Sequence, residues 1–277
     1  MHATSSISAS EAPRASKRAV TIALIVVVAV LLLADQLYGF AHDQMFTQSS
    51  YDPAARVVHS GAQTLVLGSS GAHRGLDPAV LGPGVYNAAH DGQSGYYVAA
   101  LLNALPQGAI KRVIYGFDTE DVLSGLAGPN VKHLAKYLPW ALTDPQVTAW
   151  LEPGEPLLRV KLLSGFYRYR GLGPGVMRGY LRPNWQGNGF EPLREAMAPR
   201  PLPEIPPRPA RPPVESGLAM LKAIRAGVER LDAELVVVVT PIYGYDRAAQ
   251  SEYSRAMSAM REAFSGLQFC DLTEVSD

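Results

Sequence analysis

Cysteine is nearly absent from this chain of 277 residues, which contains only Cys270. A single cysteine excludes an internal disulfide and a metal site built from several cysteines. Because Cys270 lies in an apolar run, 267–272, we expect it to be buried as a small hydrophobic side chain rather than exposed as a reactive thiol.

An excess of charge of either sign is also absent, since 25 basic residues balance 25 acidic ones. Nucleic-acid binding requires a clustered basic surface, so the composition gives no indication of a nucleic-acid partner. A glycine loop that would bind phosphate is missing too, because the glycines of 171–175 follow the sequence YRYR and no buried strand. We therefore expect no nucleotide or flavin cofactor.

The chain also lacks the spacing of metal ligands. His90/Asp91 and Glu120/Asp121 bring ligand types together, but each loop offers at most one histidine and no His-x-x-x-His pattern occurs. Metal sites need several ligands at suitable spacing, so we expect no bound metal.

The N-terminal region combines a basic flank with a long apolar segment. Residues 1–18 are small and polar and end in basic residues, and the sixteen residues 19–34 carry no charge. A bilayer core needs about 20 mostly apolar residues, so a span over 19–41 would place Asp35 at the level of the headgroups. The preceding basic residues predict a cytoplasmic N-terminus and an exported C-terminal part.

This interpretation predicts a single-pass protein of the inner (cytoplasmic) membrane. Its parts are a cytoplasmic tail (1–18), a transmembrane helix (19–41), a juxtamembrane connector (42–62) and a periplasmic domain (63–277). A cleaved signal peptide is the alternative, because Gly39 and Ala41 give a small-x-small pattern before His42. The long apolar core and the eighteen-residue leader favour a retained anchor, and both alternatives place the domain outside the cytoplasm.

Short apolar runs in the domain predict β-strands, and the runs between them have helical periodicity. The expected strands are 64–67, 85–86, 111–115, 235–240 and 268–271, and the expected helices are 95–105, 214–231 and 246–264. Strands that alternate with helices indicate a parallel sheet with helices on both faces. The expected fold class is α/β, a three-layer αβα flavodoxin-like parallel sheet after one transmembrane helix.

Two segments interrupt the alternation. Residues 119–198 form a long insertion, and residues 199–213 contain eight prolines, which predicts a stiff surface connector. The aromatic residues of the insertion would suit stacking on sugar rings, but packing of the insertion on itself is favoured. They are Tyr137, Trp140, Trp150, Phe166, Tyr167, Tyr169 and Trp185.

The sequence TLVLGSSGAHRG (64–75) holds the candidate nucleophile. An apolar strand ends in Gly68, Ser69 and Ser70, where a following helix would offer backbone N–H groups to a developing oxyanion. An ordinary turn with a serine cap has the same pattern, so this stretch alone favours the turn.

The wider block, 64–97, resembles the opening of the SGNH (GDSL-like) hydrolase superfamily, and most of all a membrane-anchored, extracytoplasmic branch. The resemblance covers roughly 64–118 and 235–272. It implies that Ser70 is the nucleophile and that Gly92, in the block NAAHDGQSG, gives its N–H to the oxyanion hole. It also implies that Asn87, which begins this block, is an oxyanion or substrate-binding residue. In the third block, VIYGFDTED, Asp118 stands where the family has an asparagine, and an aspartate cannot donate an amide N–H.

The family's base is a histidine three residues after an aspartate near the C-terminus, and this chain has no histidine after His133. We expect that the protein continues beyond Asp277, with a natural lack of the base as the alternative. His73 could substitute, but a capping or surface role is favoured for it. His90, on the second loop, is better placed.

The leading hypothesis is therefore ester hydrolysis or O-acyl transfer on an envelope carbohydrate or lipid, with Ser70 as nucleophile. The alternative is a non-catalytic binding or scaffold protein of an envelope glycan assembly on the same fold, which the absent histidine and Asp118 favour.

Overall fold

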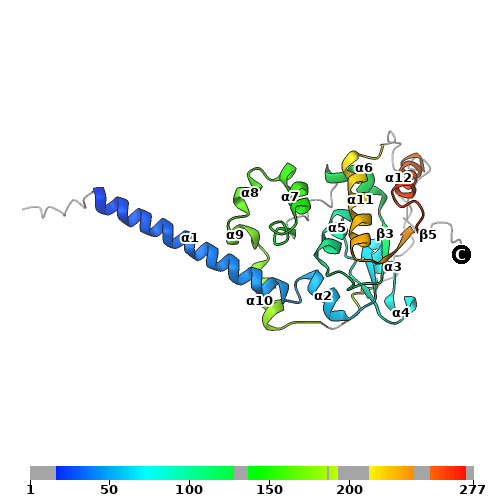
Figure 1. Cartoon of the computed structure of the whole chain (residues 1–277), viewed down its shortest axis with the longest axis horizontal. Coiled ribbons are helices and arrows are strands. Elements are labelled where there is room, and N and C mark those ends of the chain that lie inside the picture. Colours follow the sequence, from blue (N-terminus) through cyan, green and yellow to red (C-terminus); the bar gives the residue numbers. More distant parts are fainter. Residues whose placement is uncertain (1–16, 128–136, 186, 193–211, 240–249, 273–277) are drawn as a thin grey trace, which may run out of the picture.

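Five parallel strands form the central sheet of this computed structural model, which describes residues 17–127, 137–185, 187–192, 212–239 and 250–272 (Figure 1). The strands are β1 (Thr64–Gly68), β2 (Val85–Asn87), β3 (Arg112–Phe117), β4 (Glu234–Val239) and β5 (Gln268–Asp271). They lie in the order β2-β1-β3-β4-β5, and every neighbouring pair is parallel. The α/β class and the five predicted strands are thus confirmed.

Alternate side chains of the strands enter two different cores, as strand geometry requires. Leu65, Leu67 and Tyr115 belong to the main core, which also contains side chains of α5 (Gly95–Ala104), α11 (Glu215–Arg230) and α12 (Gln250–Ala263). Val66 and Val238 join a smaller core. Their apolar contacts on both faces explain why the strands are apolar throughout.

The smaller core is closed by α3 (Ser70–Gly75), which packs directly on β1 and β3. Ala72 of α3 lies so close to Gly116 that a Cβ at position 116 would stand 2.6 Å from the Cβ of Ala72. A glycine near the carboxyl end of β3 is therefore what lets the helix that begins at Ser70 approach the sheet. The short α4 (Pro78–Leu81) then leads to β2.

The N-terminal helix α1 (Lys17–Thr47) is one uninterrupted helix of 31 residues. At 1.5 Å per residue it is about 46 Å long, which exceeds the hydrocarbon core of a bilayer. The large side chains between Val20 and Leu33 are exposed, and the most apolar window has a mean hydropathy of 2.6. By length and composition α1 could cross a membrane, and a signal sequence near the N-terminus would meet the same criteria.

The C-terminal part of α1 is docked on the insertion. The carboxylate of Asp35 accepts hydrogen bonds from the Ser164 hydroxyl (2.9 Å) and from the backbone N–H groups of Gly165 (3.1 Å) and Phe166 (2.9 Å). It therefore caps the first turn of α9 (Gly165–Arg168) from another helix. One helical face of α1 makes this contact, because Asp43, two turns further on, pairs with Arg168 at 2.8 Å.

The insertion consists of short helices around an aromatic core. They are α6 (Thr119–Ser124), η1 (Gly125–Ala127), α7 (Pro145–Leu151), η3 (Glu152–Gly154), α8 (Leu158–Lys161), α9 and α10 (Gly173–Leu181). Tyr137, Trp140 and Tyr169 are buried, and Phe46 of α1 packs edge-on against both Trp140 and Tyr169. Tyr137, Trp140 and Tyr169 thus pack inward, whereas Phe166 is 55% exposed.

Several predictions concern residues outside those described. They include most of the cytoplasmic tail, most of the proline-rich segment 199–213, the last residue of the expected strand 235–240 and the start of the expected helix 246–264. Within the predicted connector 42–62, α1 continues to Thr47 and α2 follows over Pro53–Ser60.

The pH dependence of folding stability tests the burial of Asp52, the residue that caps α2. Its carboxylate is 5% exposed and caps α2 by accepting a hydrogen bond from the N–H of Ala54, and burial raises its pKa to about 6. Since the unfolded chain ionises this group near 3.8, folding stability falls as the pH rises from 4 to 6 and stays lower above 6. The difference corresponds to about 3 kcal/mol.

We expect Asp52→Asn to keep the cap, because the amide oxygen can still accept, and to remove this pH dependence. In thermal melts of the full chain in detergent, the variant should be more stable than the native protein at pH 8 and equal to it at pH 4. Asp77→Asn, at a cap of α4 built in the same way, is the matched control. Equal melting of the native protein and Asp52→Asn at pH 8 would contradict the burial of a charged group at Asp52.

Candidate functional site

The residues that the sequence singles out lie at the carboxyl ends of three neighbouring strands. Ser69 and Ser70 follow β1, the loop 88–93 follows β2, and Asp118 follows β3. The N–H of His90 donates to the carbonyl of Gly68 at 3.3 Å, so the second loop lies directly beside the serine turn. In parallel α/β sheets this edge is the usual place for ligands.

Ser70 is the first residue of α3 and its side chain is exposed, as a nucleophile must be. Ser69 occupies the cap position but its side chain makes no capping hydrogen bond. Its hydroxyl instead interacts with the carboxylate of Asp118 and opposes the effect of burial on the pKa of that group. Ser69 thus lies near both the first loop and the third.

Asp118 serves the fold as the cap of α6. One carboxylate oxygen accepts from the N–H of Glu120 at 3.0 Å, and burial raises the pKa of this carboxyl. Behind it lies Asp121, which is buried and accepts a 2.5 Å hydrogen bond from the N–H of Gly95. Burial and the neighbouring Asp118 raise the pKa of Asp121 well above its ordinary value. Sequence reasoning assigned no role to Asp121.

Asn87 is a buried connector between the first and second loops. Its amide nitrogen donates to the carbonyls of Ala72 and Leu76, at 3.0 Å each, and its side-chain oxygen accepts from the N–H of Ala89 at 3.0 Å. The amide hydrogens therefore satisfy carbonyl groups at the end of α3 and do not point to a substrate. Gly92, further along the loop, has a φ of +71°, which favours glycine, and it is half-buried.

The histidines form the least expected part of the site. His73 is 4% exposed, and its Nδ1 lies 3.0 Å from Oδ1 of Asp91. The surface role favoured for His73 is wrong, because the side chain packs beneath the second loop and stacks on His90 with the ring centroids 5.4 Å apart. No local pattern reveals this pair, since the two partners are 18 residues apart.

Arg74 fixes the charge of Asp91. Its guanidinium donates to both carboxylate oxygens, with Nε 3.0 Å from each. The hydrogen bonds from Arg74, with a contribution from His73, lower the pKa of Asp91 to about 2. Asp91 is therefore ionised at neutral pH, and its carboxylate orients the imidazole of His73 through Nδ1.

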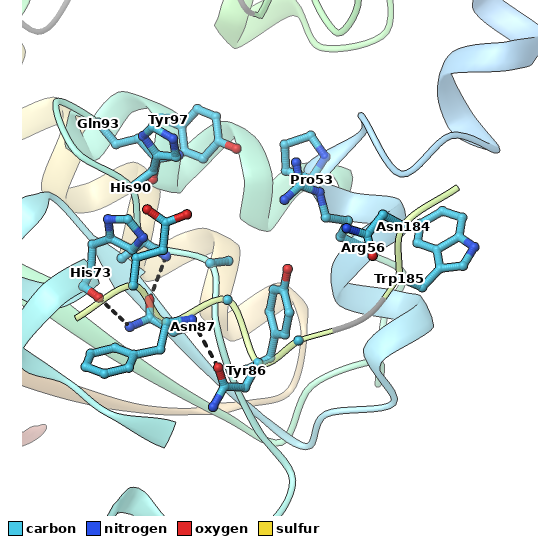
Figure 2. A pocket seen from close by; sticks show the side chains of 17 residues that line it. Pro53, Arg56, His73, Tyr86, Asn87, His90, Gln93, Tyr97, Asn184 and Trp185 are labelled. Carbon is cyan, nitrogen blue, oxygen red and sulfur yellow. Dashed lines mark hydrogen bonds between the residues drawn. The ribbon is translucent and has the colours of Figure 1, made fainter. Parts of the chain in front are cut away.

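A cavity of about 500 Å³ opens beside this pair. Figure 2 shows His73 and His90 on one side of it and Arg56, Asn184 and Trp185 on the other. The second wall comes from α2 and from the segment after α10, where the indole of Trp185 stacks on His59 at 3.9 Å. The lining is mostly polar, with aromatic rings, and it also includes Tyr86, Asn87, Gln93, Tyr97, Asn188 and Glu191.

The segment that covers the cavity is fixed to the sheet. The carbonyl of Asn188 accepts from the N–H of Asn87 at 2.8 Å. Gly189 has a φ of +78°, and a Cβ there would lie 1.8 Å from the Asn87 carbonyl oxygen. Only glycine allows this crossing, so 187–190 lies directly over the end of β2.

Cys270 is exposed, so the prediction that it is buried is wrong. It lies on β5, an edge strand of the sheet whose residues 268–270 are all exposed in the described part of the chain. In the same part, no three His, Cys, Asp or Glu side chains come together as metal ligands would.

Comparisons of the chain with protein-family models, with curated proteins and with solved structures find no match. The assignment of function therefore depends on the residues and their geometry.

The structural role of Asn87 can be tested with a nearly isosteric change. We expect Asn87→Asp to lower the free energy of unfolding by about 2–4 kcal/mol, because an ionised carboxylate cannot donate to the two α3 carbonyls that it would still face. Urea titration of the full chain in detergent measures this loss. Asn188→Asp is the control, since the oxygen of this exposed side chain accepts from the N–H of Phe190 at 3.2 Å, which a carboxylate also does. Native stability in Asn87→Asp would mean that the amide is not needed by the fold.

Proposed function

We propose that this protein is a membrane-anchored, extracytoplasmic SGNH-like protein that hydrolyses or transfers an acyl ester on an envelope carbohydrate or lipid. The strand order β2-β1-β3-β4-β5 supports the flavodoxin-like fold, because it is one of the common doubly wound orders. The three blocks that resemble the superfamily follow β1, β2 and β3, which are neighbours in the sheet.

The observation that carries the proposal is the pairing of His73 with Asp91. A serine needs a base, and the family's C-terminal histidine is not in this sequence. His73 is three residues after Ser70 in the same helix, and side chains at that spacing lie on the same side of a helix. A buried imidazole with Nδ1 fixed by an ionised carboxylate is the arrangement that a general base requires.

In the proposed reaction the Ser70 Oγ attacks the acyl carbon, and its proton passes to Nε2 of His73. The backbone N–H groups of Ser70 and Gly92 stabilise the oxyanion. When the ester bond breaks, the leaving alcohol takes the proton from His73 and the acyl group remains on Ser70. Water then releases the acid, or an acceptor hydroxyl takes the acyl group. His73 again accepts the proton of the attacking oxygen and returns it to the Ser70 Oγ as the acyl–Ser70 bond breaks.

A non-catalytic glycan-binding protein on the same fold is the second candidate. It is favoured by the two side chains that the fold itself uses: Asn87 bonds the end of α3 and Asp118 caps α6. Neither is available as a third oxyanion donor. Polar and aromatic groups around the cavity, Trp185 and Arg56 among them, would suit a sugar in this case as well.

Acylation of Ser70 distinguishes the two candidates. We expect p-nitrophenyl acetate to add one acetyl group to the native protein, and Ser70→Ala to abolish the adduct, as measured by intact mass. His73→Ala and Asp91→Asn should slow acylation, by about 100-fold or more for His73→Ala, because a general base contributes that much. Ser69→Ala is the matched control and should still be acylated.

Three results would contradict parts of this assignment. An adduct that persists in Ser70→Ala excludes Ser70 as the nucleophile. Loss of acylation in His90→Ala but not in His73→Ala transfers the role of base to His90. The absence of any adduct, together with binding of an envelope glycan that Trp185→Ala weakens, favours the binding protein.

The docked end of α1 supports the retained anchor over a cleaved signal. Cleavage after Ala41 would remove Asp35, which caps α9, and Gly39, whose backbone touches Gly165 so closely that a Cβ at 165 would lie 2.4 Å from the Gly39 Cα. The first turn of α9 would lose the carboxylate that accepts its N–H groups. The insertion would lose the part of α1 before His42 that packs against it. The basic flank before the apolar segment supports a cytoplasmic N-terminus and a periplasmic domain.

We therefore expect the mature protein to keep its N-terminal segment and to stay with the membrane fraction in alkaline carbonate. Intact mass of the purified protein should correspond to a chain that includes 19–41. A mature N-terminus at His42, or release by carbonate, would contradict the anchor. Asp35→Asn is a useful companion variant, because loss of the carboxylate should lower the melting temperature without releasing the protein.

A further inference from the structure

The insertion carries a row of exposed apolar side chains at every third residue, which we name the apolar ridge. It consists of Leu157, Val160, Leu163 and Phe166, whose exposed fractions are 75%, 63%, 64% and 55%. Leu158 and Leu162, between them, are buried in the core. The segment therefore has an apolar inner side and an apolar outer side, whereas the surface of a soluble protein would be polar there.

The ridge lies where the uncharged part of α1 ends. The side-chain amide of Gln36 donates to the carbonyl of Leu163 at 2.8 Å, and Asp35 accepts from the N–H of Phe166 at 2.9 Å. In Figure 1, α9 lies beside the C-terminal half of α1, and α8 lies beyond α9, away from the sheet. The ridge thus lies beside the C-terminal end of the exposed apolar surface that residues 19–34 form on α1. It extends that surface away from the helix axis.

The position of the ridge relative to α1 is rigid. Besides the Asp35 hydrogen bonds, Asp43 pairs with Arg168 at 2.8 Å and accepts from the Tyr169 hydroxyl at 2.8 Å. The ring of Tyr38 stacks on Phe166, with centroids 4.3 Å apart and planes inclined by 19°. A helix crossing a bilayer would therefore hold the ridge at one depth.

Charged groups border the ridge as they would at headgroup level. Lys161 pairs with Glu155 at 2.8 Å, and Arg170 pairs with the same carboxylate at 3.3 Å. Arg170 also lies 4.2 Å from the ring centre of Tyr167, and Arg159 pairs with Glu152. Apolar side chains that project beyond such a charged and aromatic border are typical of segments that lie in the membrane interface.

We propose that the apolar ridge inserts into the interfacial layer of the bilayer that α1 spans, as a second membrane contact of the protein. This inference rests on the proposed span of α1. Continuity with the exposed surface of α1 selects lipid as the occupant, because a protein partner on the ridge would have to share the same depth with the surrounding headgroups. Two contacts instead of one fix the tilt of the domain above the membrane.

A fluorescent label reports the depth of the ridge in the full chain. In a Cys270→Ser background, Leu163→Cys or Val160→Cys is labelled with an environment-sensitive dye and the protein is placed in nanodiscs with or without lipids that carry a shallow spin label. We expect blue-shifted emission that shallow spin-labelled lipid quenches, because interfacial segments lie about 5–10 Å into the bilayer. Glu229→Cys on α11 is the control, and should show neither effect.

Unquenched emission at 160 and 163 that matches Glu229→Cys would overturn the proposal. Blue-shifted emission without quenching would overturn it too, since protein and not lipid would then cover the ridge. A label at Leu31→Cys tests the span separately, with lipid spin-labelled near the bilayer centre. If Leu31 is quenched and the ridge is not, only the ridge proposal fails, whereas an unquenched Leu31 removes the span and the ridge proposal together.

Discussion

The side chain of Asn87 is the interaction on which the candidate site depends. Its amide bonds the carbonyls that end α3, and its oxygen bonds the loop that follows β2. The helix that begins with Ser70 and contains His73 is thereby tied to the loop that contains Asp91 and Gly92. Other contacts of α3 are the packing of Ala72 against β1 and β3, the ion pairs of Asp91 and the stacking of His73 on His90.

The fold could be predicted from the sequence because its signals are local. Each strand is a short apolar run, and a run such as LVVVVT is long enough to identify a buried strand but too short for a helix. The docking of α1 could not be predicted, because Asp35 and Gly165 are 130 residues apart and nothing near either one indicates the other. An aspartate at the end of an apolar segment suggests a boundary, and here it is also the cap of another helix.

The site could be predicted in position but not in chemistry. That the loops with Ser70, Gly92 and Asp118 begin at one edge of the sheet follows from the rule that parallel strands end at the same edge. Which side chains bond depends on rotamers and on loop direction, which no periodicity encodes. His73 is the instructive case: its spacing from Ser70 was visible in the sequence, but its burial and its bond to Asp91 arise only when the second loop folds over α3.

The docked helix α1 and the loops that Asn87 connects both lead to residues that line the cavity. Pro53 and Arg56, in the helix that directly follows α1, line one wall, and His73 and His90 at the sheet line the other. Phe46 of α1 contacts Trp140, and Trp140 contacts Tyr97, which also lines the cavity. Packed aromatic side chains therefore connect α1 to the site without a flexible linker. If α1 spans the membrane, the cavity stays at a fixed height above it, which suits a substrate that is itself confined to the envelope surface.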